Sequence, residues 1–402
     1  MSAIATSQPV PVLDIDPYDI DVLRDPYGYH EALRETGPVV YIKAHGVYAV
    51  GRYAECKTVM SDWPRFCLAG GVGIQDIRLP GEFRIPSKLV ETDPPEHTAT
   101  RTAVMRVLSP LVIRRFKQSF VEKAELHVDR LLALREFDAV AQCTEPYVLD
   151  AFSQSMGVQL PREETLAIGD MRFNQSGPKN ALYIAAMEKA APYLEWFENS
   201  VHRDAVLPGS LAALLFEAED DGALEPGIAT NVMRSIVGGG TDSTIAGIGF
   251  TLHQLARHPK QWEKVRADPA KVKAAFEEGI RHEAPFQVTY RTTVGPVELS
   301  GMQLPPDAKI GAFIGAGNRD PRFWERPDEF DIDRPALAGT HLALGAGIHT
   351  CLGQMIARAE SEALLGALAL RVKSIELAGP VSYRPINQMR TIAAMPVRLV
   401  PA

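Results

Sequence analysis

Cysteine is scarce in this sequence. Only four of the 402 residues are cysteines (Cys56, Cys67, Cys143 and Cys351), and no two of them form a C-x-x-C pair. So few cysteines cannot build a disulfide framework in a chain of this length. We therefore expect a reduced, cytoplasmic protein.

An excess of positive charge is also missing, as are long apolar runs. The formal net charge is −8, and this acidic balance gives no electrostatic footprint for nucleic acid. The N-terminal residues show no basic segment followed by an apolar core, which argues against a secretory signal. The strongest apolar stretches, such as residues 363–370, are too short to span a bilayer. We expect a soluble protein that binds neither nucleic acid nor membrane.

Repeats, low-complexity segments and linkers are absent as well. The apolar fraction of 46% suffices for a large core, and we expect a single domain over residues 1–402. A stretch rich in glycine and proline, residues 68–95, predicts a long irregular loop. Loops of this length inside compact proteins are usually functional.

The dominant pattern that is present is helical periodicity, with apolar residues at spacings of three and four. Helices are predicted over residues 112–134, 227–257 and 269–283, and from Cys351 through Leu370. Strands are predicted over residues 39–42, 47–50, 290–299 and 309–313. The expected fold is mainly α, with a helical part over residues 97–285 and 351–372. A smaller β-rich part is expected over residues 35–60 and 285–315, together with C-terminal strands.

One segment points to a cofactor: residues 344–353 read LGAGIHTCLG. Its glycines allow the backbone to approach a bulky planar group closely. Cys351 falls where a helix begins, so the helix N-terminus stabilises its thiolate. A thiolate ligand to haem iron favours cleavage of the O–O bond. A buried structural cysteine beside a glycine turn is the alternative.

This segment resembles the haem-binding signature of the cytochrome P450 family, F-G-x-G-x-(H/R)-x-C-x-G, with Leu344 in the place of the phenylalanine. The resemblance implies haem b as cofactor, Cys351 as the iron ligand and the P450 fold, in which helical and β-rich regions surround a buried haem. Glu278 and Arg281 lie three residues apart on one helix face and match the family's E-x-x-R motif, with Arg334 as the third partner. A solvated surface pair is the alternative interpretation.

Haem propionates require cations. His97 and Arg101 are spaced i, i+4 on a predicted helix, so both reach one anion. The resemblance adds Arg291 and His349 to the residues expected to bind the cofactor.

Three consecutive glycines, residues 238–240, precede Asp242, Ser243 and Thr244. Each glycine inside a helix costs about 1 kcal/mol relative to alanine, and a flexible turn beside a bound diatomic molecule would explain that cost. The segment resembles the family's (A/G)-G-x-(D/E)-T motif, which implies that Asp242 and Ser243, with Thr244 beside them, deliver protons during oxygen activation. Serine is less constrained at χ1 than threonine. Asp242 alone would also fit an N-cap at a helix break.

Two pairs of residues suggest an anion site. Arg234 and Ser235 lie in an apolar helical segment, where a buried charge needs a partner, and Arg234 sits roughly 13 Å along the helix from Ser243. Arg84 and Ser87, in the long loop, form a second such pair. Two arginines and two serines at one point would bind a carboxylate through charge-assisted hydrogen bonds. Alternatively, Arg84 is a solvated loop residue and Arg234 extends its head group to water.

Over nearly its whole length the chain resembles bacterial cytochromes P450 that oxidise para-substituted benzoates, especially 4-methoxybenzoate O-demethylases. That resemblance implies that these four residues bind the benzoate carboxylate. It also implies a pocket lined by Phe173, Ser176, Phe286 and Thr289. Ser176 stands where such relatives have phenylalanine, Phe286 is larger than the expected valine, and Thr289 is smaller than the expected phenylalanine. The preferred substituent is therefore open.

The implied activity is oxidative O-demethylation or hydroxylation of a small para-substituted aromatic acid with O₂. Electrons would come from a separate iron–sulfur ferredoxin reduced by a flavoprotein, and Arg114, Arg115 and Lys117 are candidate docking residues. Three alternatives stay open: a P450 hydroxylase of a terpenoid, phenolic or macrolide, a peroxygenase, and a non-catalytic haem sensor. Arg84 and Arg234 argue against large neutral substrates. Asp242 with Ser243 argues against a peroxygenase, and electron-dependent turnover would exclude a sensor.

Overall fold

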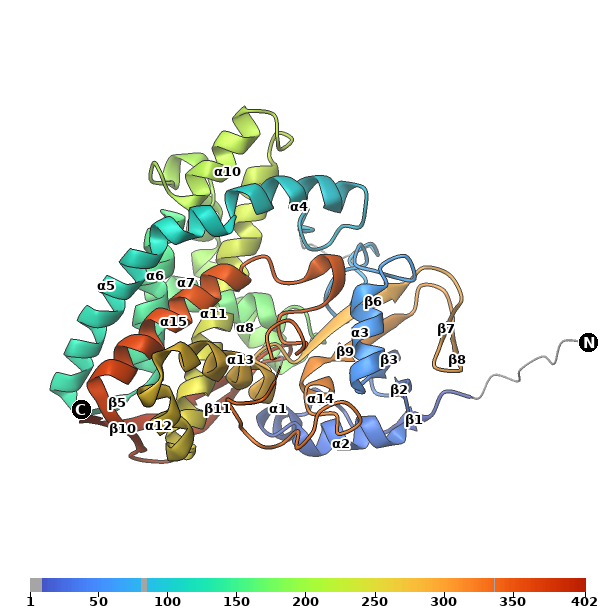
Figure 1. Cartoon of the computed structure of the whole chain (residues 1–402). Helices are drawn as coiled ribbons and strands as arrows, with labels where there is room; N and C mark the ends of the chain where they lie inside the picture. The colour runs from blue at the N-terminus through green and yellow to red at the C-terminus, as the bar shows by residue number, and fades with distance from the viewer. Residues whose placement is uncertain (1–8, 81–84, 336) are drawn as a thin grey trace, which may run out of the picture.

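The computed structural model describes residues 9–80, 85–335 and 337–402, arranged as a large helical part beside a smaller sheet-bearing part (Figure 1). The helices of the large part are α4 (Glu96–Val107), α5 (Pro110–Leu134), α6 (Glu145–Met156), α7 (Arg162–Asn174), α8 (Ala181–Ala190), α9 (Leu194–Ser200), α10 (Leu211–Asp220), α11 (Ile228–Arg257), α12 (Pro259–Ala267), α13 (Val272–Glu283) and α15 (Gln354–Arg371). The predicted mainly α fold is confirmed.

The sheet-bearing part is organised around a six-stranded mixed sheet. Its strand order is β1 (Val12–Leu13), β2 (Val40–Ile42), β3 (Val47–Val50), β9 (Lys309–Phe313), β6 (Val288–Thr293) and β4 (Phe66–Cys67). Four short helices accompany it: α1 (Ile20–Arg24), α2 (Tyr27–Thr36), α3 (Tyr53–Ser61) and α14 (Ile314–Gly317). All six residues of β6 are buried, because the sheet is covered on both faces. This strand carries Arg291 into the interior.

Three smaller sheets complete the described chain. They are the hairpin of β7 (Val297–Leu299) and β8 (Met302–Leu304), the sheet of β10 (Val372–Leu377), β13 (Pro396–Pro401) and β5 (Glu136–Asp138), and the hairpin of β11 (Ser382–Pro385) and β12 (Arg390–Ala394). The strand predicted over residues 290–299 is two strands, β6 and β7. They are separated by a turn in which Gly295 has φ of +97°, a conformation that glycine adopts without strain.

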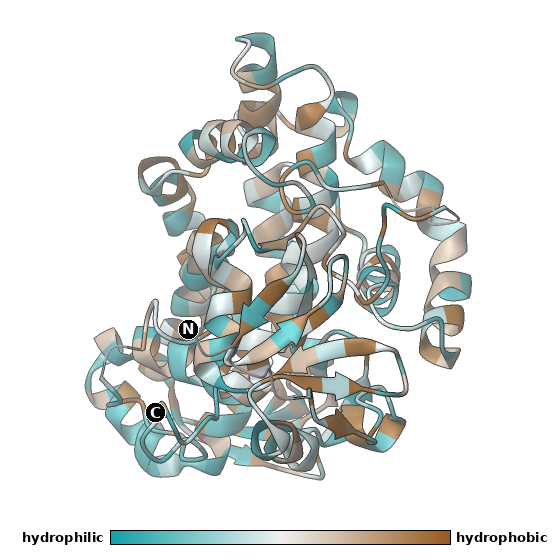
Figure 2. Ribbon diagram, turned by 90° about the vertical axis from the view of Figure 1, so that its right-hand side faces the viewer, coloured by the Kyte–Doolittle hydropathy of each residue, from teal (hydrophilic) through white to brown (hydrophobic). Residues whose placement is uncertain are grey.

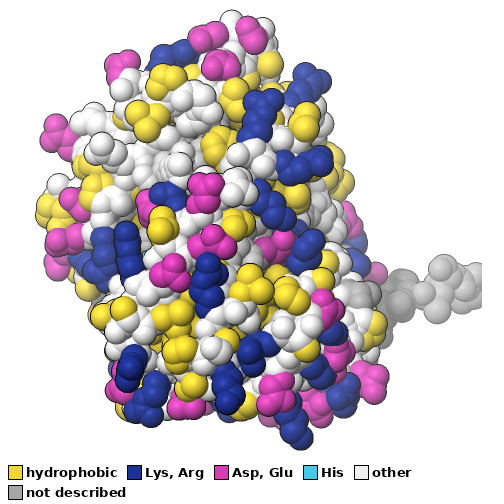
Figure 3. Space-filling view, turned by 60° about the vertical axis from the view of Figure 1, so that its left-hand side comes forward, with side chains coloured by type: hydrophobic (Ala, Val, Ile, Leu, Met, Phe, Trp, Pro, Cys, Tyr) yellow, Lys and Arg dark blue, Asp and Glu magenta, His cyan; other side chains and the backbone are white. Residues whose placement is uncertain are grey.

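The hydrophobic pattern explains how the helices pack. Figure 2 shows alternating apolar and polar residues along the outer helices, as expected for helices with one buried face. α5 and α15 lie side by side, and the core between them includes Phe120, Val128 and Leu364. On the face shown in Figure 3, acidic and basic side chains are interspersed, so the net negative charge is not concentrated there.

The helix containing the three glycines differs from the expectation. α11 is continuous over 30 residues, so neither a flexible turn nor a helix break is present at residues 238–240. Two of the glycines have packing reasons. A Cβ at Gly238 would lie 2.3 Å from Cδ of Arg172 on α7, and a Cβ at Gly240 would lie 3.0 Å from Cζ of Phe152 on α6. The glycines therefore allow neighbouring helices to approach α11.

A buried carboxyl group lies in the core beside α5 and α6. Glu360 on α15 is fully buried, and neither carboxyl oxygen has a hydrogen-bond partner within the described residues. Burial therefore raises the pKa of Glu360 well above its usual value. Burial thus favours the neutral acid over the carboxylate in the folded protein.

We predict that Glu360→Gln removes part of the pH dependence of stability. Because the folded-state pKa of Glu360 lies above the unfolded value, its unfavourable contribution is absent below about pH 4.5 and grows as the pH rises. The variant should gain about 1–3 kcal/mol relative to the wild type at neutral pH and little at pH 4.5. Urea unfolding followed by circular dichroism from pH 4.5 to 8 measures this difference.

The matched control is Glu362→Gln on the same helix, because Glu362 pairs with Lys117 near the surface at 3.5 Å. Its effect should stay below about 1 kcal/mol. An equal response of the two variants to pH would contradict the role assigned to burial of Glu360.

Candidate active site

The loop that carries Cys351 is closed by its own backbone. The N–H of Cys351 donates to the carbonyl of Leu344 at 2.7 Å, and that of Thr350 donates to the carbonyl of Gly347 at 3.2 Å. Gly345 and Gly347 have φ of +77° and +72°, a region that favours glycine. A Cβ at Gly347 would also lie 2.7 Å from Cα of Ser61 on α3. The sequence predicted that the helix begins at Cys351. In the structure α15 begins three residues later, at Gln354.

Opposing effects act on the Cys351 thiol. Burial dominates and raises the pKa of the thiol above its usual value, and the backbone N–H groups of Gly353 and Gln354 and the charges of Arg101 and Arg358 oppose this rise only in part. These donors surround the sulfur at the N-terminal end of α15, the position at which a thiolate is stabilised. A metal cation bound to the sulfur would add to these interactions and hold it as an anionic ligand.

A cluster of basic side chains gathers beside this loop. His97 on α4 and His349 have ring centroids 4.1 Å apart. Within the described residues, neither ring nitrogen of His97 has a hydrogen-bond partner, and Nε2 of His349 has none. Asp93 is the nearby carboxylate, with Oδ1 3.9 Å from Nε2 of His349. It also accepts hydrogen bonds from the N–H groups of Leu68 and Ala69.

Arg291 and Arg101, the other two residues predicted to bind the propionates, also have interior hydrogen-bond partners. Arg291 is 4% exposed and donates through Nη1 to Oγ1 of Thr289 and to the carbonyl of Tyr290. Burial lowers the pKa of Arg291 to about 10. Arg101 donates through Nη2 to the carbonyl of Thr350 at 2.5 Å, which joins α4 to the cysteine loop.

These observations test whether the residues fit a haem. Both ring nitrogens of His97 and Nε2 of His349 lack hydrogen-bond partners within the described residues, so Asp93 does not satisfy all the polar groups of the cluster. Burial, followed by the charges of His349 and Arg101, lowers the pKa of His97 to about 4, as expected where cations outnumber anions. Buried donors of this kind are stabilised by an anion. The two propionates of a haem supply that charge, and the nearby thiol supplies an axial ligand. The donor set fits the cofactor.

Asp242 lies on α11 against α7. A Cβ at Gly169 would lie 1.7 Å from Oδ2 of Asp242, so only glycine permits this approach. Nη2 of Arg384 lies 3.8 Å from Oδ1 of Asp242, and Oδ2 has no hydrogen-bond partner among the described residues. Burial raises the pKa of Asp242 to about 7, while Arg384 opposes this shift.

A chain of charges connects Asp242 with the surface. Arg384 contacts Oδ2 of Asp170 at 3.0 Å, and the half-exposed Lys189 contacts the same oxygen at 3.0 Å. The neighbouring alcohols are directed to the helix backbone: Ser243 donates to the carbonyl of Gly239 and Thr244 to that of Gly240. An acid that holds a proton near neutral pH thus lies one residue from a hydroxyl group.

The two serines predicted to bind an anion lie together. Oγ of Ser87 and Oγ of Ser235 are 2.6 Å apart, although the residues are 148 positions apart in sequence. Asn231 fixes the loop to α11, because its side chain accepts from the N–H of Lys88 and donates to the carbonyl of Pro86. Sequence reasoning missed Asn231, which carries no motif. Arg84 lies outside the described residues.

Arg234 has an acidic partner within the chain. Its Nε donates to both carboxylate oxygens of Glu198 on α9, at 3.2 and 3.0 Å, and Nη2 donates to Oε2. The sequence predicted that a charge in this segment needs a partner, but it did not identify Glu198. The role of Arg234 toward a ligand stays a prediction.

The predicted pocket residues occupy two places. Phe173 and Phe286 have ring centroids 6.1 Å apart and pack with Ile386 and Met389. Ser176 donates to the carbonyl of Arg172, and Thr289 accepts from Arg291 as described above. Ile386 and Met389 come from the C-terminal segment between two strands, where no motif indicated them.

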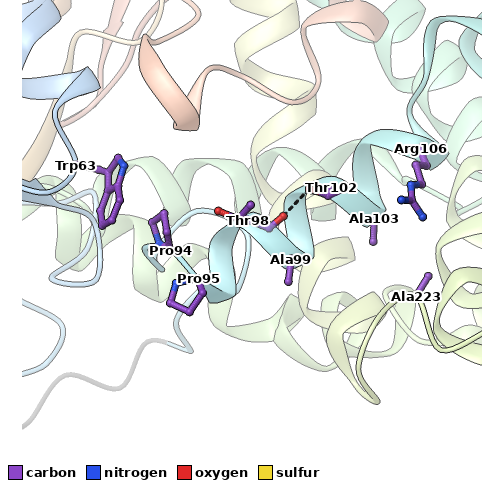
Figure 4. A pocket seen from close by; sticks show the side chains of 9 residues that line it. All are labelled: Trp63, Pro94, Pro95, Thr98, Ala99, Thr102, Ala103, Arg106 and Ala223. Carbon is purple, nitrogen blue, oxygen red and sulfur yellow. Dashed lines mark hydrogen bonds between the residues drawn. The ribbon is translucent and has the colours of Figure 1, made fainter.

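A separate open groove of about 770 Å³ runs along α4 (Figure 4). It is lined by Trp63, Pro94, Pro95, Thr98, Ala99, Thr102, Ala103, Arg106 and Ala223. None of the predicted cofactor or substrate residues that the structure describes lines it, and His97 and Arg101 occupy other positions around the same helix.

Comparison with known proteins identifies the class. A family model described as Cytochrome P450 matches residues 203–376. The chain is 40% identical over 395 residues to cytochrome P450 CYP199A2 of Rhodopseudomonas palustris, covering 98% of this chain and 95% of that protein. It is 27% identical to 6-deoxyerythronolide B hydroxylase of Saccharopolyspora erythraea, covering 97% and 99%. The structure of CYP109Q5 from Chondromyces apiculatus matches with a TM-score of 0.80 and 28% identity, covering 97% of this chain and 99% of that one.

The chain therefore belongs to the cytochrome P450 family. It is a monooxygenase, an oxidoreductase whose cofactor is haem b and which uses O₂ and a redox partner. Among the residues that the structure describes, no helix is long and apolar enough to cross a membrane.

We predict that Gly347→Ala disrupts the cysteine loop. The substitution forces a Cβ onto a residue with positive φ, which costs about 1–2 kcal/mol, and brings it against the backbone of Ser61. The expected result is a lower haem content of the purified protein and a weakened thiolate spectrum of its ferrous carbon monoxide complex.

Gly366→Ala is the control, because Gly366 lies within α15 and a Cβ there meets nothing within 4 Å. This variant should retain haem fully and gain up to about 1 kcal/mol of stability. Full haem content in Gly347→Ala would show that the loop tolerates the side chain.

Proposed function

We propose that this P450 oxidises a small para-substituted aromatic carboxylic acid, with oxidative O-demethylation of a 4-methoxybenzoate as the leading reaction. The observation that carries the proposal is the hydrogen bond between Ser87 and Ser235 at 2.6 Å, and Ser235 directly follows Arg234 on α11. Hydroxyl groups and a guanidinium are suited to bind a carboxylate. The resemblance to benzoate-oxidising P450s, stated from the sequence, supports the same substrate class.

The spacing along α11 suits a small aromatic acid. Ser235 and Ser243 are eight residues apart, which corresponds to about 12 Å of helix. If the carboxylate binds near Ser235, the aromatic ring and its para substituent would extend along α11 toward Asp242 and Ser243. Phe173 and Phe286 offer apolar surface for the ring.

The cofactor has a defined place in this proposal. Cys351 would hold the haem iron, while His97, Arg101, Arg291 and His349 would hold its propionates. When bound, the haem supplies the activation of O₂ and the transfer of one oxygen atom to the substrate. The protein residues bind, orient and control protons.

Asp242 is suited to proton control. Its pKa of about 7 leaves it partly protonated at neutral pH. The ion pairs from Arg384 through Asp170 to the half-exposed Lys189 would link it to water. Ser243 would pass the proton inward. Hydroxylation of the ether methyl carbon gives a hemiacetal, which collapses to formaldehyde and a hydroxybenzoate. Overall, the ether, O₂, two electrons and two protons give the phenol, formaldehyde and water.

The electrons are proposed to come from a separate iron–sulfur ferredoxin with its flavoprotein reductase. The sequence-predicted docking residues Arg114, Arg115 and Lys117 lie near the start of α5. Lys117 lies 3.5 Å from Glu362 of α15, so an acidic partner would compete with an existing surface pair.

A second candidate function is oxidation of a neutral small molecule such as a terpenoid, phenolic or macrolide. One observation favours it: Arg234 is already paired with Glu198, so the pocket does not require an anionic ligand for charge balance. Titration of the ferric protein with 4-methoxybenzoate and with its neutral analogue 4-methoxyacetophenone distinguishes the two functions.

We predict that Arg234→Ala weakens binding of 4-methoxybenzoate by at least about tenfold, since a charge-assisted hydrogen bond contributes about 1.5–3 kcal/mol. Binding of 4-methoxyacetophenone should change little. The measurement is the shift of the Soret absorbance toward high-spin iron. Arg257→Ala, at the exposed C-terminal end of the same helix, is the control and should behave as the wild type. Equal losses for the acid and the ketone would exclude an anion site at Arg234.

We predict that turnover falls as the pH rises through about 7, because Asp242 loses its proton there. Asp242→Asn should slow product formation by at least about tenfold and abolish this inflection while haem content stays normal.

Asp170→Asn tests the same assignment, because the charge of Asp170 raises the pKa of Asp242. Its inflection should move to lower pH. Identical pH profiles in all three proteins would exclude Asp242 as the titrating group.

A further inference from the structure

The ion pair between Arg234 and Glu198 joins two segments that the sequence keeps apart. Glu198 lies on α9, 36 positions before Arg234 on α11. Both carboxylate oxygens take part, through Nε and Nη2 of the guanidinium. The side chains are 43% exposed for Glu198 and 21% exposed for Arg234. The pair is therefore accessible to solvent, and Arg234 directly precedes Ser235 along α11.

The geometry makes Glu198 a competitor for any carboxylate that binds Arg234. A guanidinium presents a planar set of donors that matches one carboxylate in a two-point contact, and Glu198 already uses Nε and Nη2. A substrate carboxylate that needs the same donors must displace it. Because partly exposed ion pairs are weak and solvent competes for both groups, this exchange is energetically accessible.

The exchange does not require α9 to leave its position. The helix is anchored by Phe197, which is 3% exposed and packs in the main hydrophobic core, and by the fully buried Val201 that follows it. Glu198 projects from the same turn, and rotation of its side chain toward solvent is enough to free Arg234. The event is therefore local to one side chain.

We propose that Glu198 is a specificity-determining residue, an internal carboxylate that occupies Arg234 in the resting enzyme and is displaced by an aromatic acid substrate. The inference rests on the proposed function, since it concerns the same anion site. Its consequence is that the acid binds with a competition cost that a neutral ligand does not meet. Glu198 thus sets how strongly the enzyme distinguishes aromatic acids from uncharged analogues.

The test is a ligand titration of the ferric holoenzyme with 4-methoxybenzoate and 4-methoxyacetophenone. Glu198→Gln keeps the shape of the side chain and removes its charge. It should tighten binding of the acid by about 2- to 5-fold and leave binding of the ketone unchanged. Glu195→Gln, an exposed glutamate of the same helix, is the matched control and should leave both affinities unchanged.

A double variant separates competition from a general change in the pocket. In the Arg234→Ala background no cation remains for Glu198 to occupy, so Glu198→Gln should have no further effect on binding of the acid. A gain that persists in this background would overturn the inference. An equal gain for acid and ketone, or weaker acid binding in Glu198→Gln, would overturn it as well.

The outcomes also separate this inference from the proposed function. If the acid binds the wild type, Arg234→Ala weakens it and Glu198→Gln changes nothing, the proposed anion site stands and the role of Glu198 is wrong. If no variant binds the acid while neutral ligands shift the spectrum, both the proposed function and the inference fail.

Discussion

Two adjacent carboxylates on α13, those of Glu277 and Glu278, hold in place the segments that present Cys351. Glu278 and Arg281 are both fully buried and paired through two hydrogen bonds of 2.6 and 2.8 Å, and Arg334 adds a third contact to Glu278. The alternative of a solvated surface pair is therefore wrong. Removing one member of such a buried pair costs about 3–5 kcal/mol, because the other charge is left uncompensated.

These charges act on the segment that leads to the cysteine. Arg281 donates to the carbonyls of Asn318 and Pro327, and Oδ1 of Asn318 accepts from the N–H of Leu342, just before the glycine loop. Glu277 binds His341 on one side of the loop and Arg358 of α15 on the other. One helix turn thus fixes both ends of the cysteine loop, and Arg358 in turn lowers the pKa of the Cys351 thiol.

The opposite side of the site depends on how closely helices approach α11. Gly169 of α7 allows Asp242 to be buried, and Gly238 makes room for the side chain of Arg172 from the same helix. The same contact between α7 and α11 therefore buries Asp242, which raises its pKa, and positions the side chain of Arg172 against Gly238. The burial of Asp242 and the position of Arg172 are coupled through this helix packing, because glycine at these positions leaves no side chain to separate the helices.

The sequence by itself determined the fold class and the chemistry of the cofactor site. The Cys351 loop, the Glu278–Arg281 pair and the helical periodicity are local patterns, and each dictates a local structure. The tertiary structure alone decided which distant groups meet. Glu198 reaches Arg234, Asn231 fixes the loop of Ser87, and Arg172 replaces a flexible turn as the reason for Gly238. These contacts join segments that no spacing relates, because helix crossing and side-chain burial are fixed only when the whole chain packs.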